Sequence, residues 1–165
     1  MNSGELVNAL TVDVEEYFQV SAFEDVIDRS TWDGLESRVA LGTRRILELF
    51  ERHGVRATFF VLGWIADRHP ELVAELCDRG HEIASHGYEH RLVTSFDAEA
   101  FRADLRRASD AIHRACGVRV VGFRAPSFSF SGETPWAFEV LRDEGYEWSS
   151  SVFPVRHDRY GIPDF

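Results

Sequence analysis

Two histidines, His86 and His90, lie four residues apart in the segment S-H-G-Y-E-H, residues 85–90. The preceding residues, 81–85, are typical of a short strand, so both imidazoles are expected where a strand runs into a loop. A neutral imidazole is a common ligand of divalent metal ions, yet two histidines can also fall close together without a shared role. The pair therefore predicts a metal site only if the sequence supplies further ligands that fold toward it.

The segments around this pair alternate between apolar runs and stretches of helical periodicity. Apolar runs predict strands over residues 6–14, 57–62, 81–85, 120–124 and 146–152, and helical spacing predicts helices over 36–53, 70–79, 97–116 and 134–144. The connection over residues 15–35 is expected to be irregular. Strands that alternate with helices predict an α/β fold with a parallel sheet, either a doubly wound sheet or a (β/α) barrel.

In both folds, functional side chains gather at the carboxyl ends of the strands. Asp13 and Glu15 end the first predicted strand, where their spacing of two puts them on the same side. Two such carboxylates repel each other unless a cation lies between them or one keeps its proton. Arg124 ends the fourth strand, and Trp148 on the fifth offers an apolar wall. One carboxylate and two imidazoles would form a facial site with open positions, suited to zinc or a similar divalent ion.

The composition narrows the classes of function. A chain of 165 residues, 44% of them hydrophobic, can bury a core and is expected to form one domain. A net charge of -10 argues against a nucleic-acid partner, which needs clustered cations. All 18 basic residues are arginine, which excludes Schiff-base chemistry and a lysine-dependent phosphate loop. We recognise neither a secretory signal nor an apolar run of membrane-spanning length, so a cytoplasmic location is expected.

At its strand ends the sequence resembles the polysaccharide deacetylase family, carbohydrate esterases that share the NodB homology domain. The segment S-H-G-Y-E-H matches the H-x-x-x-H metal motif of that family, R-A-P-S-F at 124–128 matches its arginine-proline motif, and T-V-D-V-E at 11–15 matches its opening T-F-D-D. With residues 138–152 included, the resemblance covers nearly the whole chain. The D-V-E form of the first motif looks most like the branch found beside exopolysaccharide export loci.

The resemblance implies an irregular (β/α) barrel of about seven strands, of which about five βα units are recognised here. Residues 1–165 are therefore expected to form a single polysaccharide deacetylase-like domain that lacks the C-terminal part of the barrel. The family places its catalytic acid in a leucine-x-histidine motif near the end of the barrel, and the sequence reaches Phe165 without one. We read the chain as truncated and expect weak turnover from these residues alone.

The resemblance also assigns roles in catalysis and substrate binding. Asp13 takes the part of the catalytic base, and Arg124 takes that of the residue that pairs with the base and orients it. Pro126, in the arginine-proline motif, and Trp148 are assigned to substrate binding. The arginine motif departs from the usual P-Y-G, because this chain continues Pro126-Ser-Phe-Ser.

The metal ligands need one adjustment to the family pattern. The second aspartate of the opening motif is a metal ligand in the family, but Val14 occupies the aligned position here. We transfer this role to Glu15, because only residues i and i+2 share a strand face. Glu16 would have to bend back from the following loop. With His86 and His90, Glu15 would bind a divalent metal, for which zinc is favoured.

The implied function is metal-dependent hydrolysis of N-acetyl groups from the N-acetylhexosamine units of a polysaccharide, with release of acetate. Relatives with related first motifs open cyclic amides or imides, so hydrolysis of such rings on the same fold is the alternative enzymatic reading. A third reading is a non-catalytic fragment that binds glycan or metal. The incomplete barrel would leave an exposed apolar sheet edge, through which self-association is expected.

Overall fold

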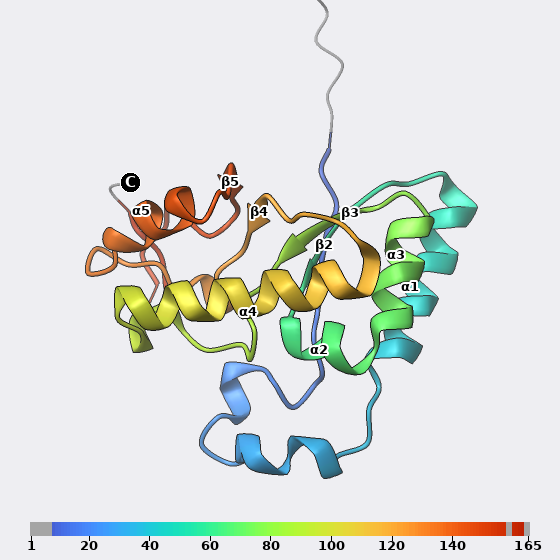
Figure 1. Cartoon of the computed structure of the whole chain (residues 1–165), viewed down its shortest axis with the longest axis horizontal. Coiled ribbons are helices and arrows are strands. Elements are labelled where there is room, and N and C mark those ends of the chain that lie inside the picture. The colour runs from blue at the N-terminus through green and yellow to red at the C-terminus, as the bar shows by residue number, and fades with distance from the viewer. Residues whose placement is uncertain (1–7, 158–159, 164–165) are drawn as a thin grey trace, which may run out of the picture.

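The computed structural model describes residues 8–157 and 160–163 of the chain. Five parallel strands form one sheet (Figure 1). They are β1 (Thr11–Val14), β2 (Thr58–Val61), β3 (Glu82–Ser85), β4 (Gly122–Phe123) and β5 (Trp148–Ser149). Each strand pairs with the next in sequence, in the order β1-β2-β3-β4-β5. This order is that of a barrel wall, since a doubly wound sheet reverses its strand order. The predicted α/β fold is confirmed.

Five α-helices connect the strands: α1 (Val39–His53), α2 (Gly63–Arg68), α3 (Pro70–Asp78), α4 (Ala98–Cys116) and α5 (Trp136–Asp143). Gly54 ends α1 in the left-handed region, with a φ of 62° that a glycine adopts without strain. Asp97 caps α4, because its side chain accepts a hydrogen bond from the amide of Ala100. In Figure 1, α4 crosses in front of the strands, while α1 and α3 lie together at one side.

The two faces of the sheet have different surroundings. Phe59 and Val61 point toward the helices and belong to the main apolar core. Because strand side chains alternate, their neighbours point to the opposite face. There the register sets Asp13 of β1 beside Phe60 of β2, and Phe60 beside Ala84 of β3. The candidate site lies on this second face, at the carboxyl ends of the strands.

Several strands are shorter than the apolar runs predict. The run over 6–14 yields only Thr11–Val14; Leu10 is 46% exposed, and residues 6 and 7 lie outside the described residues. The runs over 120–124 and 146–152 each yield a strand of two residues. Apolar character marks where a chain is buried, whereas strand length depends on how far two neighbouring backbones stay parallel.

The helix α2 is absent from the sequence-based prediction. It has six residues and follows β2 after a single residue, Leu62. A helix of fewer than two turns is too short to show a helical period, and its buried residues continue the apolar run of the strand. This helix matters for the site, because its first two amides donate hydrogen bonds to the loop between His86 and His90, which we call the histidine loop.

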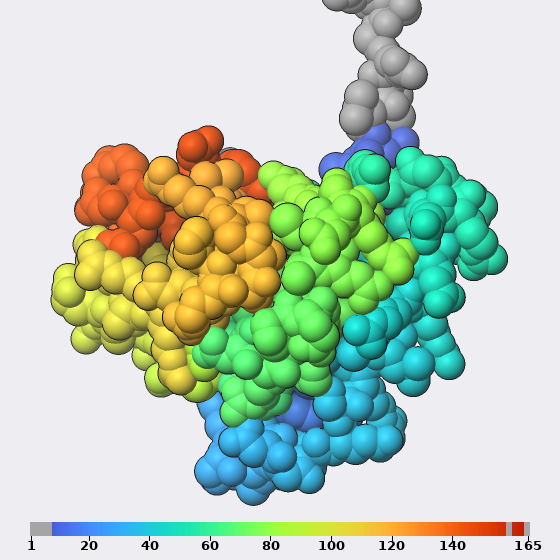
Figure 2. Space-filling view, turned by 45° about the vertical axis from the view of Figure 1, so that its right-hand side comes forward, coloured from blue at the N-terminus to red at the C-terminus, as the bar shows by residue number. Residues whose placement is uncertain are grey.

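The segment between β1 and α1 is irregular, as predicted, and includes two short 3-10 helices, Ser21–Phe23 and Arg29–Gly34. An aromatic cluster anchors it to the domain. The ring of Trp32 lies 5.7 Å from that of Phe18 and 5.8 Å from that of Trp64, which belongs to α2. Figure 2 shows this segment in blue at the lower end of the molecule, against the green surface around α2. None of the helices in the described part of the chain has the length and apolar character needed to cross a membrane.

Candidate active site

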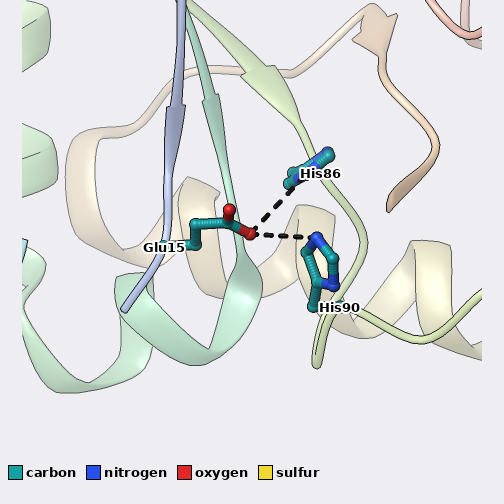
Figure 3. Close-up of side chains that lie close together, drawn as sticks. All are labelled: Glu15, His86 and His90. Carbon is teal, nitrogen blue, oxygen red and sulfur yellow. Dashed lines mark ion pairs between the residues drawn. The ribbon is translucent and has the colours of Figure 1, made fainter. Parts of the chain in front are cut away.

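Glu15, His86 and His90 lie together at the carboxyl ends of β1 and β3 (Figure 3). One potential ligand atom from each lies within 4.8 Å of the other two. Glu15 Oε2 is 3.0 Å from His90 Nε2 and 4.0 Å from His86 Nε2. Residues 75 positions apart in sequence thus converge because their parallel strands end at the same edge. We call these three residues the metal-ligand trio.

The trio contains buried polar atoms that make no well-directed hydrogen bond, although His90 Nε2 lies 3.0 Å from Glu15 Oε2. Glu15 Oε2 and His90 Nδ1 are buried, and neither has a hydrogen-bond partner within the described residues. A buried polar atom without a well-directed hydrogen bond is destabilising, and a cation bound between the carboxylate and the imidazoles would relieve this. One carboxylate and two imidazoles are also donors that zinc and similar divalent ions accept. The trio therefore fits a divalent metal.

The protonation of Glu15 and His86 suits ligation. Burial acts to raise the pKa of Glu15, but the attraction of His90 and His86 outweighs it, so this pKa lies below its usual value. Burial lowers the pKa of His86, against the opposing charges of Asp13 and Glu15. At neutral pH the carboxyl is then ionised and the imidazole neutral, which are the forms that bind a metal.

The tautomer of His86 is set by the next strand. His86 Nδ1 lies 2.8 Å from the backbone carbonyl oxygen of Arg124, which follows β4. A carbonyl oxygen can only accept, so Nδ1 carries the proton and donates it. His86 Nε2 is thereby left with a free lone pair on the side of Glu15. Such an outer hydrogen bond orients a ligand histidine and raises its basicity.

Asp13 borders the trio and is held by Arg124. Arg124 Nη1 donates to Asp13 Oδ1 at 2.7 Å, while the other carboxylate oxygen, Oδ2, lies 4.0 Å from His86 Nε2. The Asp13 side chain is 34% exposed, so water can reach it. One oxygen is thus fixed by the guanidinium, and the second faces the trio and solvent. This arrangement can accept a proton from a water molecule held beside His86.

Arg124 is itself immobilised by residues that the sequence does not point to. Its Nη2 donates to Thr11 Oγ1 and to Ser150 Oγ, each at 3.0 Å, and its guanidinium carbon lies 3.9 Å from the centre of the Phe60 ring. Thr11, Phe60 and Ser150 share a sheet face with Asp13, which their alternation along the strands could have indicated. The residue types alone gave no reason to select them.

Glu16, the alternative ligand, points away from the trio. It is fully buried, and its carboxylate accepts hydrogen bonds from the amide of Arg38 at 2.9 and 3.2 Å and from the hydroxyl of Ser37. Arg38 is the residue just before α1, so this carboxylate compensates for unpaired amide groups at the start of a helix. Strand alternation thus correctly separates Glu15 from Glu16.

The two residues assigned to substrate binding lie outside the trio. Pro126 is buried at the start of a short 3-10 helix, Pro126–Phe128. Trp148 packs against Gly122, where an added Cβ would come within 2.1 Å of the indole, and its ring lies 5.7 Å from that of Phe60. Trp148 is therefore wedged against the sheet.

A cavity of about 780 Å³ lies beside the strand ends. Its walls come from residues 20–25, from Leu92 and Thr94, and from residues 127–131. Leu92 follows His90 by two residues, but no member of the trio lines this cavity; Asp13 and Glu15 line a second, smaller one of about 320 Å³. A hydrogen bond of 2.7 Å between the hydroxyls of Ser21 and Ser127 ties two walls of the larger cavity together.

Comparison with known proteins gives consistent results. Residues 29–148 match the family model described as polysaccharide deacetylase. The chain is 39% identical over 74 residues to a chitooligosaccharide deacetylase of Rhizobium leguminosarum bv. trifolii, over 45% of this chain and 34% of that protein. It is 29% identical over 98 residues to a peptidoglycan-N-acetylglucosamine deacetylase of Bacillus cereus, over 59% of this chain and 36% of the other.

A solved structure shows the same similarity in three dimensions. A crystal structure from Mycobacterium smegmatis, classed with the polysaccharide deacetylases, superposes with a TM-score of 0.72 at 30% identity. The superposition covers 88% of this chain and 50% of the other. The chain thus spans between about a third and a half of the length of these relatives.

Proposed function

Since the chain belongs to the polysaccharide deacetylase family, we propose that it removes N-acetyl groups from the N-acetylhexosamine units of a polysaccharide. The reaction consumes one water for each acetyl group and yields acetate and a free amine on the sugar. The observation that carries the proposal is the placement of the Asp13–Arg124 pair beside the metal-ligand trio. A general base next to a metal site is one arrangement that can hydrolyse an unactivated amide.

Glu15, His86 and His90 would hold a divalent metal, and zinc is our proposal from the donor set. When bound, such an ion polarises the acetyl carbonyl and lowers the pKa of water. Asp13 would accept the proton of the attacking water through the oxygen that faces His86. Arg124 would keep that oxygen aimed at the site by holding the other one at 2.7 Å. His86, kept neutral by burial, would remain a ligand below the usual pKa of histidine.

The glycan would occupy the cavity between residues 20–25 and 127–131. Leu92, two residues after His90, lines it, and its volume of about 780 Å³ is within the usual range of small-ligand pockets. The names of the relatives, a chitooligosaccharide and a peptidoglycan-N-acetylglucosamine deacetylase, support a substrate with N-acetylglucosamine units. Among such glycans, the D-V-E form of the first motif favours an exopolysaccharide.

The test is an assay with N-acetylated chitooligosaccharides as the probe. The protein, loaded with Zn²⁺, is incubated with the oligosaccharide, and acetate and free amine are both measured. We expect slow release of the two products in equal amounts, loss of this activity after chelation, and recovery when Zn²⁺ is returned. The Asp13→Asn variant is the matched negative control. Equal release by this variant and by the unaltered protein would contradict the proposal.

A further inference from the structure

Two residues of the loop between His86 and His90 lie close to the carboxylate of Asp104 on α4. The amide of Tyr88 donates a hydrogen bond to Asp104 Oδ2 at 3.1 Å. The same oxygen would lie 3.0 Å from a Cβ at position 87, which is a glycine with a φ of 77°. The first two of the three residues between the histidines therefore approach Asp104 closely, and Gly87 makes that approach possible.

We propose that Asp104 is a positioning residue of the metal site, which fixes the spacing of the two histidines by accepting the hydrogen bond of the Tyr88 amide. This inference rests on the proposed function, because it assumes that the trio holds a metal. Within the described part of the chain Asp104 makes no hydrogen bond or ion pair with either imidazole, so it would act through the loop backbone between them.

The backbone carbonyls of the loop and the hydroxyl of Tyr88 are bound by α2. The amides of Gly63 and Trp64 donate to the carbonyls of Gly87 and Tyr88, at 2.9 and 3.0 Å. The side chain of Tyr88 is 3% exposed, and its hydroxyl donates to Asp67 Oδ2 at 2.9 Å. These contacts fix the carbonyls and the ring, whereas the amide of Tyr88 faces α4. Arg107 of α4 also contacts the loop, with its guanidinium carbon 3.5 Å from the centre of the Tyr88 ring and an ion pair of 3.4 Å to Glu89. Asp104 is the residue of α4 that binds the loop backbone.

The backbone conformation of the loop requires contacts that hold it in place. His90 has a φ of 53°, which is uncommon for a residue other than glycine and is retained only when the surroundings enforce it. If the Tyr88 amide lost its acceptor, the loop would have to shift to find another. A shift of the loop moves His90 relative to His86, and metal ligands tolerate little displacement. Outer partners of a metal site typically contribute about 10- to 100-fold in affinity.

The role requires an acceptor oxygen rather than a negative charge. Burial raises the pKa of Asp104 to about 6, and a carboxyl keeps an acceptor oxygen in both of its protonation states. An asparagine also presents such an oxygen in a side chain of the same shape, whereas a leucine of similar volume has none. Comparing Asp104→Asn with Asp104→Leu thus separates the effect of losing the acceptor oxygen from the effect of changing the side-chain volume.

The experiment measures Zn²⁺ affinity by competition with a chromophoric chelator, with circular dichroism to verify folding. We expect Asp104→Leu to weaken Zn²⁺ binding about 10- to 100-fold and Asp104→Asn to change it by less than about 3-fold. If the leucine variant does not fold, Asp104→Ala removes the same acceptor without added volume. Two controls lie on α4: Asp110→Leu at an exposed position, and Ile112→Val, which lowers stability from the buried side. Both should bind Zn²⁺ like the unaltered protein.

The outcomes separate the two claims. If the unaltered protein binds no Zn²⁺, the metal site of the proposed function is wrong, whatever the variants do. If the unaltered protein binds Zn²⁺ and a folded Asp104→Leu or Asp104→Ala variant binds it equally well, the positioning role of Asp104 is wrong. Weakening by Ile112→Val to the same extent would also overturn it, because general destabilisation would then account for the effect.

Discussion

Arg124 and His86 are linked through the main chain, since His86 Nδ1 donates to the Arg124 carbonyl at 2.8 Å. The side chain of the same arginine binds Asp13 at 2.7 Å. Arg124, which directly follows β4, therefore orients a candidate metal ligand through its backbone carbonyl and the candidate base through its guanidinium. The two tasks use different atoms, so substitution of the side chain should separate them.

Arg124→Lys should impair turnover and leave metal binding intact. A lysine retains the positive charge and the carbonyl, but it cannot bind Asp13, Thr11 and Ser150 together, because it lacks the planar fork of arginine. A displaced base is expected to cost about 100-fold in kcat. Acetate release and Zn²⁺ titration measure the two effects. A variant that loses Zn²⁺ as well would show that the side chain, and not the carbonyl, holds His86.

Asp13→Asn should abolish most of the activity without loss of the metal. Asparagine can still accept a hydrogen bond from Arg124, so the local structure should persist, but its amide cannot take a proton from water. General-base catalysis typically contributes about 100- to 10,000-fold, and we expect kcat to fall within that range. The measurement is acetate release at saturating oligosaccharide, with Zn²⁺ content determined on the same sample. Loss of Zn²⁺ would instead make Asp13 a ligand.

Much of this arrangement can be predicted from the sequence, because side chains alternate along a strand and parallel strands end at a common edge. Strand alternation predicts that Asp13 and Glu15 share a face and that Glu16 does not, and the structure places them so. The carboxyl ends of parallel strands meet at one edge, which predicts that His86 and Arg124 approach Asp13. These inferences need only the period of a strand and the direction of the chain.

What supports the site could not be predicted in this way. Asp104 lies on a helix that begins with a clear cap and an apolar face, and nothing local distinguishes it from a solvent-exposed acid. Thr11 lies on β1 and Ser150 directly follows β5; alternation can place both on the sheet face of Asp13, but it does not show that they bind Arg124. Such contacts depend on how elements pack, which propensity and periodicity do not specify.

Glu15→Gln and Glu16→Gln should have opposite effects. Glu15 belongs to the trio, so its replacement should weaken Zn²⁺ binding by more than the about 10- to 100-fold that outer partners contribute. Glu16 receives the Arg38 amide and the Ser37 hydroxyl, so its replacement should lower the free energy of unfolding by about 2 kcal/mol and spare Zn²⁺ binding. Chelator competition and urea denaturation give the two values. If Glu16→Gln is the variant that loses Zn²⁺, the assignment of the ligand is reversed.

The pH dependence of stability should change when Asp104 is replaced. Burial raises the pKa of this carboxyl from 3.8 to about 6, to which Glu89 adds, against a hydrogen bond from Tyr88 and the charges of Arg91 and Arg107. Between these two pH values the folded protein holds a proton that the unfolded chain has lost. The stabilisation from this proton is present at low pH and is lost as the pH rises through about 6. A shift of about two pKa units corresponds to about 3 kcal/mol.

Asparagine does not titrate, so Asp104→Asn should gain stability relative to the unaltered protein as the pH rises. The difference in the free energy of unfolding between the two should increase by about 2 kcal/mol from pH 4 to pH 7, in favour of the variant. Urea denaturation of the metal-free proteins measures it, because metal binding would add its own pH dependence. Asp110→Asn, exposed on the same helix, controls for the loss of one negative charge. A difference that stays constant across this range would mean that Asp104 has the same pKa in the folded and the unfolded protein. Burial beneath the histidine loop would then not raise the pKa of Asp104.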